Sequence, residues 1–122
     1  MRGTVLVVDD EPLVRELVAE LLEEEGFRTR HAPDGQTALE MLDENGIDLV
    51  LSDVQMPRLD GPSLVRRLRD RGHAVPVVLM SGVVARVDVP GAPFVRKPFD
   101  ADHLVATVGR IMAARTRAAA GC

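Results

Sequence analysis

Residues suited to phosphoryl-transfer chemistry stand at the ends of four of the five apolar, strand-like runs in this chain. They are the carboxylates Asp9, Asp10 and Asp53, the hydroxyl of Ser81 and the ammonium of Lys97. In an open parallel α/β sheet, ligands bind in the crevice beyond the carboxyl ends of the strands, so four strand ends can bring these groups to one point. Their combination indicates a divalent cation and a phosphoryl group.

Each of these side chains has a defined task in such a site. Mg²⁺ prefers oxygen ligands and is usually held by one or two carboxylates, which Asp10 and Asp53 can supply, while Asp9 acts directly or through a bound water. Lys97 can pair with one phosphoryl oxygen and the Ser81 hydroxyl can donate to another. Because like charges disfavour each other's ionisation, three crowded acids would cost stability without a cation. We therefore expect a Mg²⁺ site.

Each residue taken alone also has an ordinary structural interpretation. Asp9 or Asp10 could simply cap a helix that begins at Pro12. A serine followed by glycine, as at Ser81, is common in turns, and an isolated lysine such as Lys97 is usually solvated. Their joint placement at strand ends favours the functional site over these alternatives.

The elements that must position these residues alternate between strand and helix. Strand patterns span residues 4–8, 27–31, 47–52, 75–80 and 94–96. Helical patterns begin near Pro12, Asp34, Pro62 and Asp100, with Asp34 and Asp100 expected as helix caps. Near-continuous apolar strands alternating with helices indicate a parallel sheet covered on both faces. The alternation fails between residues 82 and 93, where two glycines and two prolines leave room for at most about two helical turns.

Length and composition restrict the classes of protein that this chain can represent. Its 122 residues fit a single domain over 1–122, with a core at about 4–113 and residues 114–122 as a helix extension or frayed tail. A net charge of −4 and the absence of Trp and Tyr argue against direct nucleic acid binding. The chain has neither a run of roughly 20 apolar residues nor a signal-peptide pattern, which predicts a cytoplasmic protein without membrane insertion.

The histidines and the arginine-rich stretch receive structural interpretations. His31, His73 and His103 share no ligand-like spacing and are interpreted as structural or solvated. The run of arginines at positions 66, 67, 69 and 71 is interpreted as a solvated helix face, with a partner contact as the less favoured alternative.

Four segments, in this order, carry a resemblance to a known family. VLVVDDEP, LVLSDVQMPRLDG, VVLMSG and FVRKPF resemble the signature segments of the response-regulator receiver domain (CheY-like), the phosphoacceptor module of two-component phosphorelays. The resemblance covers the chain from Val5 to about Met112. It implies a flavodoxin-like, doubly wound (βα)5 sandwich with a five-stranded parallel sheet in the order 2-1-3-4-5, here with a shortened or irregular fourth helix.

The resemblance also implies a role for individual residues. Asp53 would take a phosphoryl group from the phosphohistidine of a histidine kinase or of a histidine phosphotransfer protein. The backbone carbonyl of Gln55 would join Asp9, Asp10 and Asp53 as a ligand of Mg²⁺. The peptide bond between Lys97 and the proline that follows is cis in the family, which would aim Lys97 inward.

Switching in this family couples the phosphoryl group to a hydroxyl residue and an aromatic residue, which are Ser81 and Phe94 here. The hydroxyl moves toward the phosphate and the aromatic ring rotates inward, which changes the surface where partners dock. Phe94 lacks the phenol of the commoner tyrosine, so packing should dominate its outward state. Because the segment 82–93 is short, we expect output through the first helix or the loops of the site.

Two other classes of protein fit the sequence less well than a phosphoacceptor. A haloacid-dehalogenase-type phosphatase needs an aspartate two residues after its nucleophile, where this chain has Gln55, which cannot shuttle a proton. We therefore expect a signalling phosphoacceptor that assists its own phosphorylation and dephosphorylation, and not an enzyme. A pseudo-receiver that works without phosphorylation is disfavoured by the complete set of acids, hydroxyl and lysine.

The organisation of the whole protein has two candidate forms. Met1 lies only three residues before the first strand and the tail is short, which favours a stand-alone single-domain response regulator. A receiver domain from a hybrid histidine kinase remains the alternative, because such receivers also have a compact segment after the fourth strand.

Overall fold

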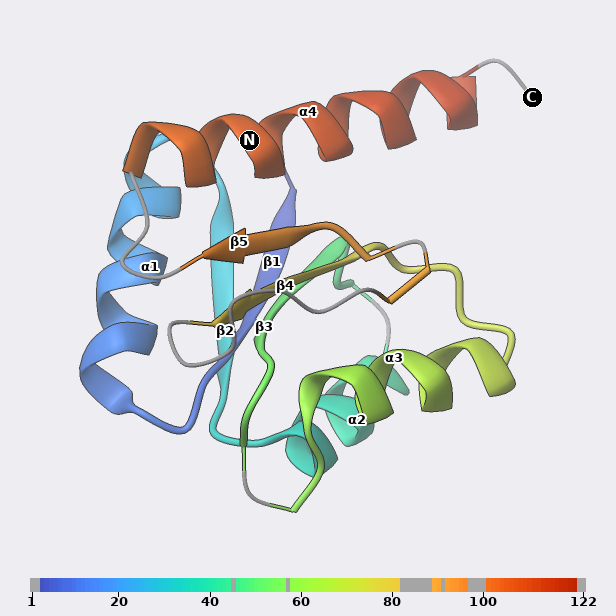
Figure 1. Cartoon of the computed structure of the whole chain (residues 1–122). Coiled ribbons are helices and arrows are strands. Elements are labelled where there is room, and N and C mark those ends of the chain that lie inside the picture. The colour runs from blue at the N-terminus through green and yellow to red at the C-terminus, as the bar shows by residue number, and fades with distance from the viewer. Residues whose placement is uncertain are drawn as a thin grey trace.

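Five strands lie side by side in one parallel sheet in the order β2-β1-β3-β4-β5 (Figure 1). A computed structural model describes residues 3–44, 46–56, 58–81, 89–90, 92–96 and 101–120, the last five as backbone only. The strands are β1 (Thr4–Val8), β2 (Arg28–Ala32), β3 (Leu49–Asp53), β4 (Val77–Ser81) and β5 (Phe94–Arg96). The predicted parallel sheet and its strand order are confirmed.

Helices cover both faces of this sheet. They are α1 (Pro12–Glu24), α2 (Gly35–Leu42), α3 (Gly61–Asp70) and α4 (Ala101–Ala120). Helices α1 and α4 lie on one side of the sheet, and α2 and α3 lie on the other (Figure 1). No helix within the described part of the chain is long and apolar enough to cross a membrane.

Alternation along the strands divides the core into two apolar clusters. Val5 and Val7 of β1 face α1 and α4, whereas Leu6 and Val8 face α2 and α3. On the α1/α4 face the cluster includes Val18, Leu22, Leu49, Leu51, Leu104 and Val108. On the α2/α3 face it includes Ala38, Leu39, Val50, Leu64, Val65 and Leu68. The sheet is therefore buried on both faces, which explains why its central strands are almost continuously apolar.

The boundaries of two strands differ from the sequence prediction in a way that affects the site. β3 and β4 begin two residues later than predicted and each ends one residue later. Before β4, Pro76 has no N–H to donate, and only its carbonyl joins the ladder, by accepting from the amide of Val50 at 2.9 Å. As a result Asp53 and Ser81 are the last residues of their strands and share the rigidity of the sheet.

Side chains cap two of the described helix starts, the predicted cap Asp34 and also Asp60, which was not predicted. The carboxylate of Asp34 accepts from the amide of Thr37 at 2.7 Å at the start of α2, and Asp60 accepts from Ser63 at 2.8 Å at the start of α3. The predicted cap at Asp100 lies outside the described residues. The backbone of α4 continues to Ala120.

The irregular segment after β4 is described only in part. Residues 82–88 and 91 lie outside the described residues, so the predicted shortening of a helix there remains a prediction. Just before β5, Val89 and Ala92 form an isolated antiparallel bridge, in which the Ala92 amide donates to the Val89 carbonyl at 3.0 Å. The chain therefore turns tightly immediately before β5.

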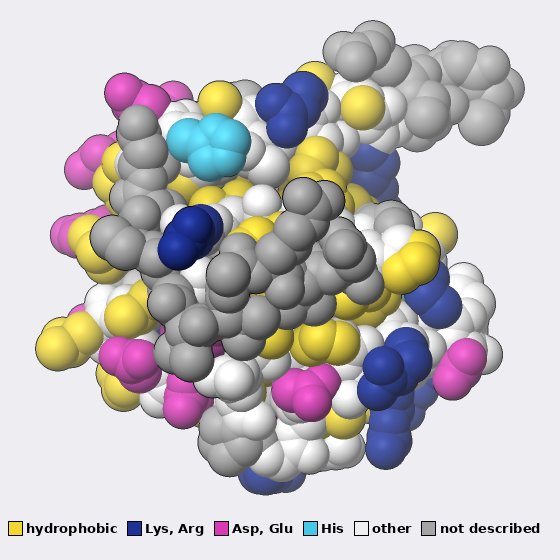
Figure 2. Space-filling model, viewed as in Figure 1, with side chains coloured by type: hydrophobic (Ala, Val, Ile, Leu, Met, Phe, Trp, Pro, Cys, Tyr) yellow, Lys and Arg dark blue, Asp and Glu magenta, His cyan; other side chains and the backbone are white. Residues whose placement is uncertain are grey.

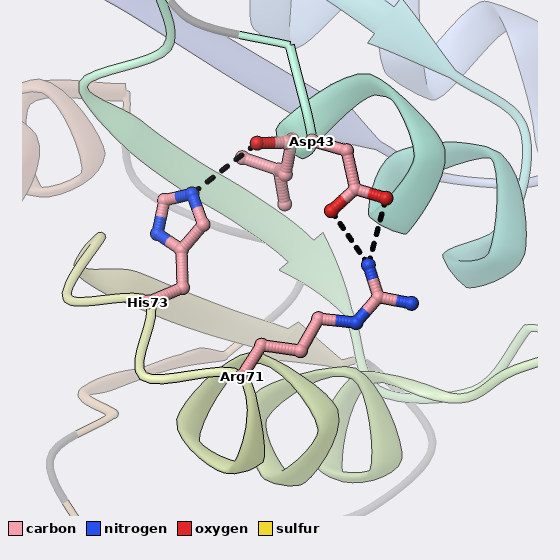
Figure 3. Close-up of polar contacts among 4 residues, drawn as sticks. Asp43, Arg71 and His73 are labelled. Carbon is pink, nitrogen blue, oxygen red and sulfur yellow. Dashed lines mark hydrogen bonds and ion pairs between the residues drawn. The ribbon is translucent and has the colours of Figure 1, made fainter.

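The carboxyl-terminal ends of α2 and α3 are joined by polar contacts (Figure 3). One nitrogen of Arg71 lies 2.6 and 2.7 Å from the two carboxylate oxygens of Asp43. The Nε2 atom of His73 lies 3.3 Å from the carbonyl oxygen of Leu42, and its Nδ1 accepts from the amide of Val75 at 3.2 Å. A neutral ring with its proton on Nε2 satisfies both contacts, so His73 has a structural role.

Part of the arginine-rich stretch on α3 is structural as well. Arg69 donates to the carbonyls of His73 and Val75 at 2.9 and 3.1 Å, and Arg71 reaches α2 as described above. Figure 2 shows dark-blue side chains gathered on the right of the molecule, over α3. The interpretation of this stretch as a simple solvated face is therefore incomplete, because two of its guanidinium groups fasten α3 to neighbouring backbone or to α2.

Candidate functional site

The register of β1 and β3 brings two of the predicted acids together. Val8 of β1 pairs with Ser52 of β3, so the next residues, Asp9 and Asp53, lie side by side at the carboxyl end of the sheet. Side chains alternate between the two faces of a strand, and Asp9 and Asp53 continue the positions of β1 and β3 that face α1 and α4. Both side chains are therefore directed toward that face. Both carboxylates are buried, Asp9 fully and Asp53 with 8% of its surface exposed.

Asp10 completes a group of three carboxylates. Oxygen atoms of Asp9, Asp10 and Asp53 all lie within 4.8 Å of one another. Asp10 is exposed, whereas its two partners are buried, so the group opens to solvent on one side. The predicted convergence of these three acids is therefore present in the structure.

This donor set fits a hard divalent cation. All the donors are oxygens, as Mg²⁺ requires, and the open side leaves room for the waters and substrate oxygens that this ion normally retains. Carboxylates so close together disfavour each other's ionisation unless a positive charge or a proton offsets the repulsion. Asp9, Asp10 and Asp53 are thus the residues that would hold the metal.

The loop from β1 to α1 is ordered by contacts of Asp9 itself. Its Oδ1 accepts from the amide of Glu11 at 3.0 Å, and its backbone carbonyl accepts from Nη1 of Arg15 at 2.7 Å. The cap position of α1 is occupied by Glu11, whose side chain makes no capping hydrogen bond to a described residue. Neither Asp9 nor Asp10 therefore serves as the conventional cap considered in the sequence analysis.

Ser81 and Phe94 lie on the neighbouring strands. Asp53 pairs with Met80 of β4, so Ser81 follows one residue further along, and it is 1% exposed. Ser81 in turn pairs with Arg96 of β5, while Phe94, two residues earlier, is half-buried and packs against the α2/α3 cluster. The hydroxyl residue and the aromatic residue thus occupy adjacent strands.

Two predicted contributors are not tested by the geometry. Gln55 is exposed two residues after Asp53, and the proposed role of its carbonyl stays a prediction. Lys97 lies outside the described residues, as does the proline after it, so neither the position of the ammonium nor the predicted cis peptide bond is tested. Arg96, the residue before Lys97, ends β5 next to Ser81.

Sequence reasoning missed an ion pair near the site. Nη1 of Arg58, in the loop after β3, lies 3.2 Å from Oδ2 of the buried cap residue Asp34. Burial alone would raise the pKa of Asp34, but hydrogen bonds from Thr37 and the charge of Arg58 outweigh it, so the pKa lies below its usual 3.8. The two partners are 24 residues apart, and no local pattern signals such a pair.

The outer face of α1 has exposed leucines beside acidic residues. Leu13 is 80% exposed and Leu17, one turn later, is 51% exposed. Between α1 and β2, Glu16, Ala19, Glu20, Glu23 and His31 line a shallow groove of about 340 Å³. Yellow and magenta side chains accordingly alternate along the left edge of Figure 2, over α1. This surface begins only three residues after Asp10.

Known proteins share this arrangement of sequence and fold. A model of the response regulator receiver domain matches residues 5–109. The transcriptional regulatory protein CseB of Streptomyces avermitilis is 40% identical over 114 residues, or 88% of this chain and 48% of CseB. The sensor histidine kinase RcsC of Salmonella typhimurium is 49% identical over 74 residues, or 61% of this chain and 8% of RcsC. The chain thus spans about half the length of CseB and a small part of RcsC.

A solved structure agrees with these sequence matches. The receiver domain of the Francisella response regulator 1452 superposes with a TM-score of 0.81 at 32% identity, covering 93% of this chain and 98% of that domain. Because the family model spans most of the sequence and the fold agrees, this chain belongs to the family of response regulator receiver domains.

Proposed function

We propose that this receiver domain is a Mg²⁺-dependent phosphoacceptor in a two-component phosphorelay, with Asp53 as the acceptor. The observation that carries the proposal is the convergence of the Asp9, Asp10 and Asp53 carboxylates at the carboxyl end of the sheet. The phosphoryl donor is the phosphohistidine of a histidine kinase or of a histidine phosphotransfer protein. The protein works in the cytoplasm, where kinases of this kind use ATP.

The proposed chemistry assigns one task to each residue. An oxygen of Asp53 attacks phosphorus, the N–P bond breaks, and the histidine nitrogen keeps the bonding electron pair. Ser81 donates its hydroxyl to one phosphoryl oxygen, and Lys97 pairs with another. Asp9, Asp10, Asp53 and the backbone carbonyl of Gln55 would hold Mg²⁺, which would neutralise the charge of the phosphoryl oxygens.

Phosphorylation would change the surface of the domain through Ser81 and Phe94. Support comes from their positions on the adjacent strands β4 and β5 and from the half-buried state of the Phe94 ring, which leaves it room to become more buried. The ring has no hydroxyl, so packing alone determines whether it points outward or inward.

The outer face of α1 is the surface that we assign to the phosphoryl donor. The exposed Leu13 and Leu17 fit an apolar helix of the donor, and the glutamates beside them fit a basic rim. Leu17→Glu should slow phosphotransfer from a histidine kinase of the same organism about tenfold, while leaving phosphorylation by acetyl phosphate unchanged. An equal effect on both donors would contradict this assignment.

The protein as a whole is proposed to be a stand-alone response regulator. Support comes from the solved chain of the Vibrio cholerae chemotaxis protein CheY4, which is 28% identical and is covered to 97% by this sequence, whereas the chain covers only 48% of the regulator CseB. A receiver attached to a hybrid histidine kinase is the second candidate, supported by the higher identity within the RcsC segment. An immunoblot of native cell extract separates the two, because the hybrid kinase would be several times larger than this chain.

The phosphoacceptor role is tested with a small-molecule donor. The native chain and Asp53→Asn are incubated with acetyl phosphate, with Mg²⁺ or with a chelator, and their intact masses are measured. The proposal predicts a single phosphoryl adduct that requires Mg²⁺ and is absent from Asp53→Asn. A native chain that binds Mg²⁺ and forms no adduct would instead be a pseudo-receiver, and release of inorganic phosphate from added phosphomonoesters would indicate a phosphatase.

A further inference from the structure

The loop that follows the proposed phosphoacceptor is held closely against its surroundings. We call the described residues 54–56 and 58–60, between β3 and α3, the site loop. The amide of Gly61 donates to the carbonyl of Val54 at 2.9 Å, which brings the two ends of the loop together. A Cβ atom placed on Gly61 would lie 2.6 Å from the carbonyl oxygen of Asp53. The beginning of α3 therefore rests on the backbone of Asp53 with no space for a side chain.

The start of α2 contacts the other side of the site loop. A Cβ atom placed on Gly35 would lie only 2.2 Å from the carbonyl oxygen of Leu59, so the two backbones approach as closely as glycine permits. Immediately before Gly35, the buried carboxylate of Asp34 uses one oxygen to cap α2 and the other to contact Arg58 of the site loop. One residue thus connects the loop to a rigid helix.

Arg58 has an unusual backbone conformation. With φ at +71°, it is the one non-glycine residue with a positive φ among those that the structure describes. An arginine gains nothing from this conformation by itself, and glycine would adopt it more easily. Such strain persists where surrounding contacts determine the conformation, and the charge-assisted bond to Asp34 is such a contact.

We propose that the Asp34–Arg58 ion pair is a positioning contact for the metal centre. It holds the site loop, and with it the carbonyl of Gln55 beside Asp53, in the arrangement that binds Mg²⁺. Neither Asp34 nor Arg58 touches the ion or the phosphoryl group. The inference rests on the proposed function, because it assigns these two residues to the Mg²⁺ site of that function.

The opposite end of the same two helices offers a matched control. Arg71 joins α3 to Asp43 at the end of α2, with nitrogen to oxygen distances of 2.6 and 2.7 Å (Figure 3). This second ion pair also links α2 to the α3 unit through one arginine and one aspartate, but it lies at the opposite, carboxyl-terminal ends of the two helices. A general loosening of α2 against α3 would follow from losing either pair, whereas an effect on the metal centre would follow only from losing the Asp34–Arg58 pair.

Calorimetric titration with Mg²⁺, on the complete chain, tests the inference. We expect Arg58→Gly to weaken Mg²⁺ binding about tenfold, the lower end of the range for outer contacts at metal sites, and Arg58→Lys to stay within about twofold of the native chain. Arg71→Ala should also stay within about twofold. Arg58→Gly relieves the positive φ, so its thermal stability should not fall below that of Arg71→Ala. Loss of affinity without loss of stability separates positioning from a merely structural role.

The outcomes distinguish this inference from the function on which it rests. If Arg58→Gly binds Mg²⁺ with the same affinity as the native chain, the inference is overturned and the proposed function is left intact. Equal weakening by Arg58→Gly and Arg71→Ala would do the same. A native chain that binds no Mg²⁺ would overturn both. Asp34→Asn, which keeps an oxygen for the helix cap, provides a second variant and is expected to weaken Mg²⁺ binding like Arg58→Gly.

Discussion

The two faces of the sheet are held in different ways. On the α2/α3 face, one ion pair joins the start of α2 to the site loop, and another joins the ends of α2 and α3. The backbones of Gly35 and Leu59 also approach each other closely. On the α1/α4 face, the helices pack against the sheet through an apolar cluster, and α1 leaves Leu13 and Leu17 exposed on its outer side. The carboxylates of Asp9, Asp10 and Asp53 lie at the carboxyl edge of the sheet, where both faces meet.

This difference separates two tasks that a receiver domain must combine. On the α2/α3 face, the loop that follows Asp53 is tied to the start of α2 by the Asp34–Arg58 ion pair and by the close approach of Gly35 to Leu59. On the α1/α4 face, the outer side of α1 exposes Leu13 and Leu17 close to Asp10. We therefore expect the α2/α3 face to provide rigidity and the outer side of α1, on the other face of the sheet, to provide the docking surface.

The largest effect is expected inside α1. Leu22 is fully buried in the α1/α4 cluster, so Leu22→Ala should lower the free energy of unfolding by about 4 kcal/mol. Leu17→Ala, on the exposed side of the same helix, should change it by less than about 0.5 kcal/mol. Urea denaturation followed by circular dichroism measures both. Similar losses in the two variants would contradict the division of α1 into an inner and an outer side.

A smaller effect is expected where α2 meets the site loop. Gly35→Ala places a methyl group 2.2 Å from the Leu59 carbonyl oxygen, so it should lower the free energy of unfolding by about 2 to 3 kcal/mol. Gly46→Ala is the control, because nothing lies within 4 Å and only its positive φ of +110° is unfavourable, at a cost of about 1 kcal/mol. Chemical denaturation compares the two, and an equal cost would show that the close approach has no energetic weight.

The smallest effect depends on pH. The pKa of Asp34 is lower in the folded state than its usual 3.8, so its charge stabilises the fold above that pH, and this contribution is lost as the pH falls through the folded pKa. At pH 7 we expect Asp34→Asn to be less stable than the native chain by about 1 kcal/mol. The difference should shrink as the pH falls below 3.8, as thermal melts at several pH values can show. A difference that is constant with pH would contradict the assignment of this stability to the charge of Asp34.

The strand ends were predictable from sequence because each apolar run stops visibly at a polar residue. That pattern was enough to place Asp9, Asp10 and Asp53 together before any geometry was known. The limits of β3 and β4 were not predictable to the residue, since the ladder depends on which amides donate, and Pro76 cannot. The helix cap at Asp34 was predictable from sequence, because its hydrogen bond involves an amide only three residues further along.

Contacts that depend on tertiary structure left no signal in the sequence. The bond from Arg15 to the carbonyl of Asp9 needs the loop already folded, and the bond from Arg58 to Asp34 joins segments 24 residues apart. The positive φ of Arg58 is equally hidden, because arginine does not favour it. Sequence therefore indicated the candidate residues for the chemistry, and the structure added the contacts around them.

The central claim is that Asp53 receives the phosphoryl group, and mapping the modified residue tests it most directly. After incubation with acetyl phosphate and Mg²⁺, borohydride reduction converts an aspartyl phosphate into homoserine, and peptide mass mapping locates it. We predict one modified position, Asp53, and none when Mg²⁺ is withheld. Modification at Asp9, at Asp10 or at Ser81, or modification that is independent of Mg²⁺, would contradict the account.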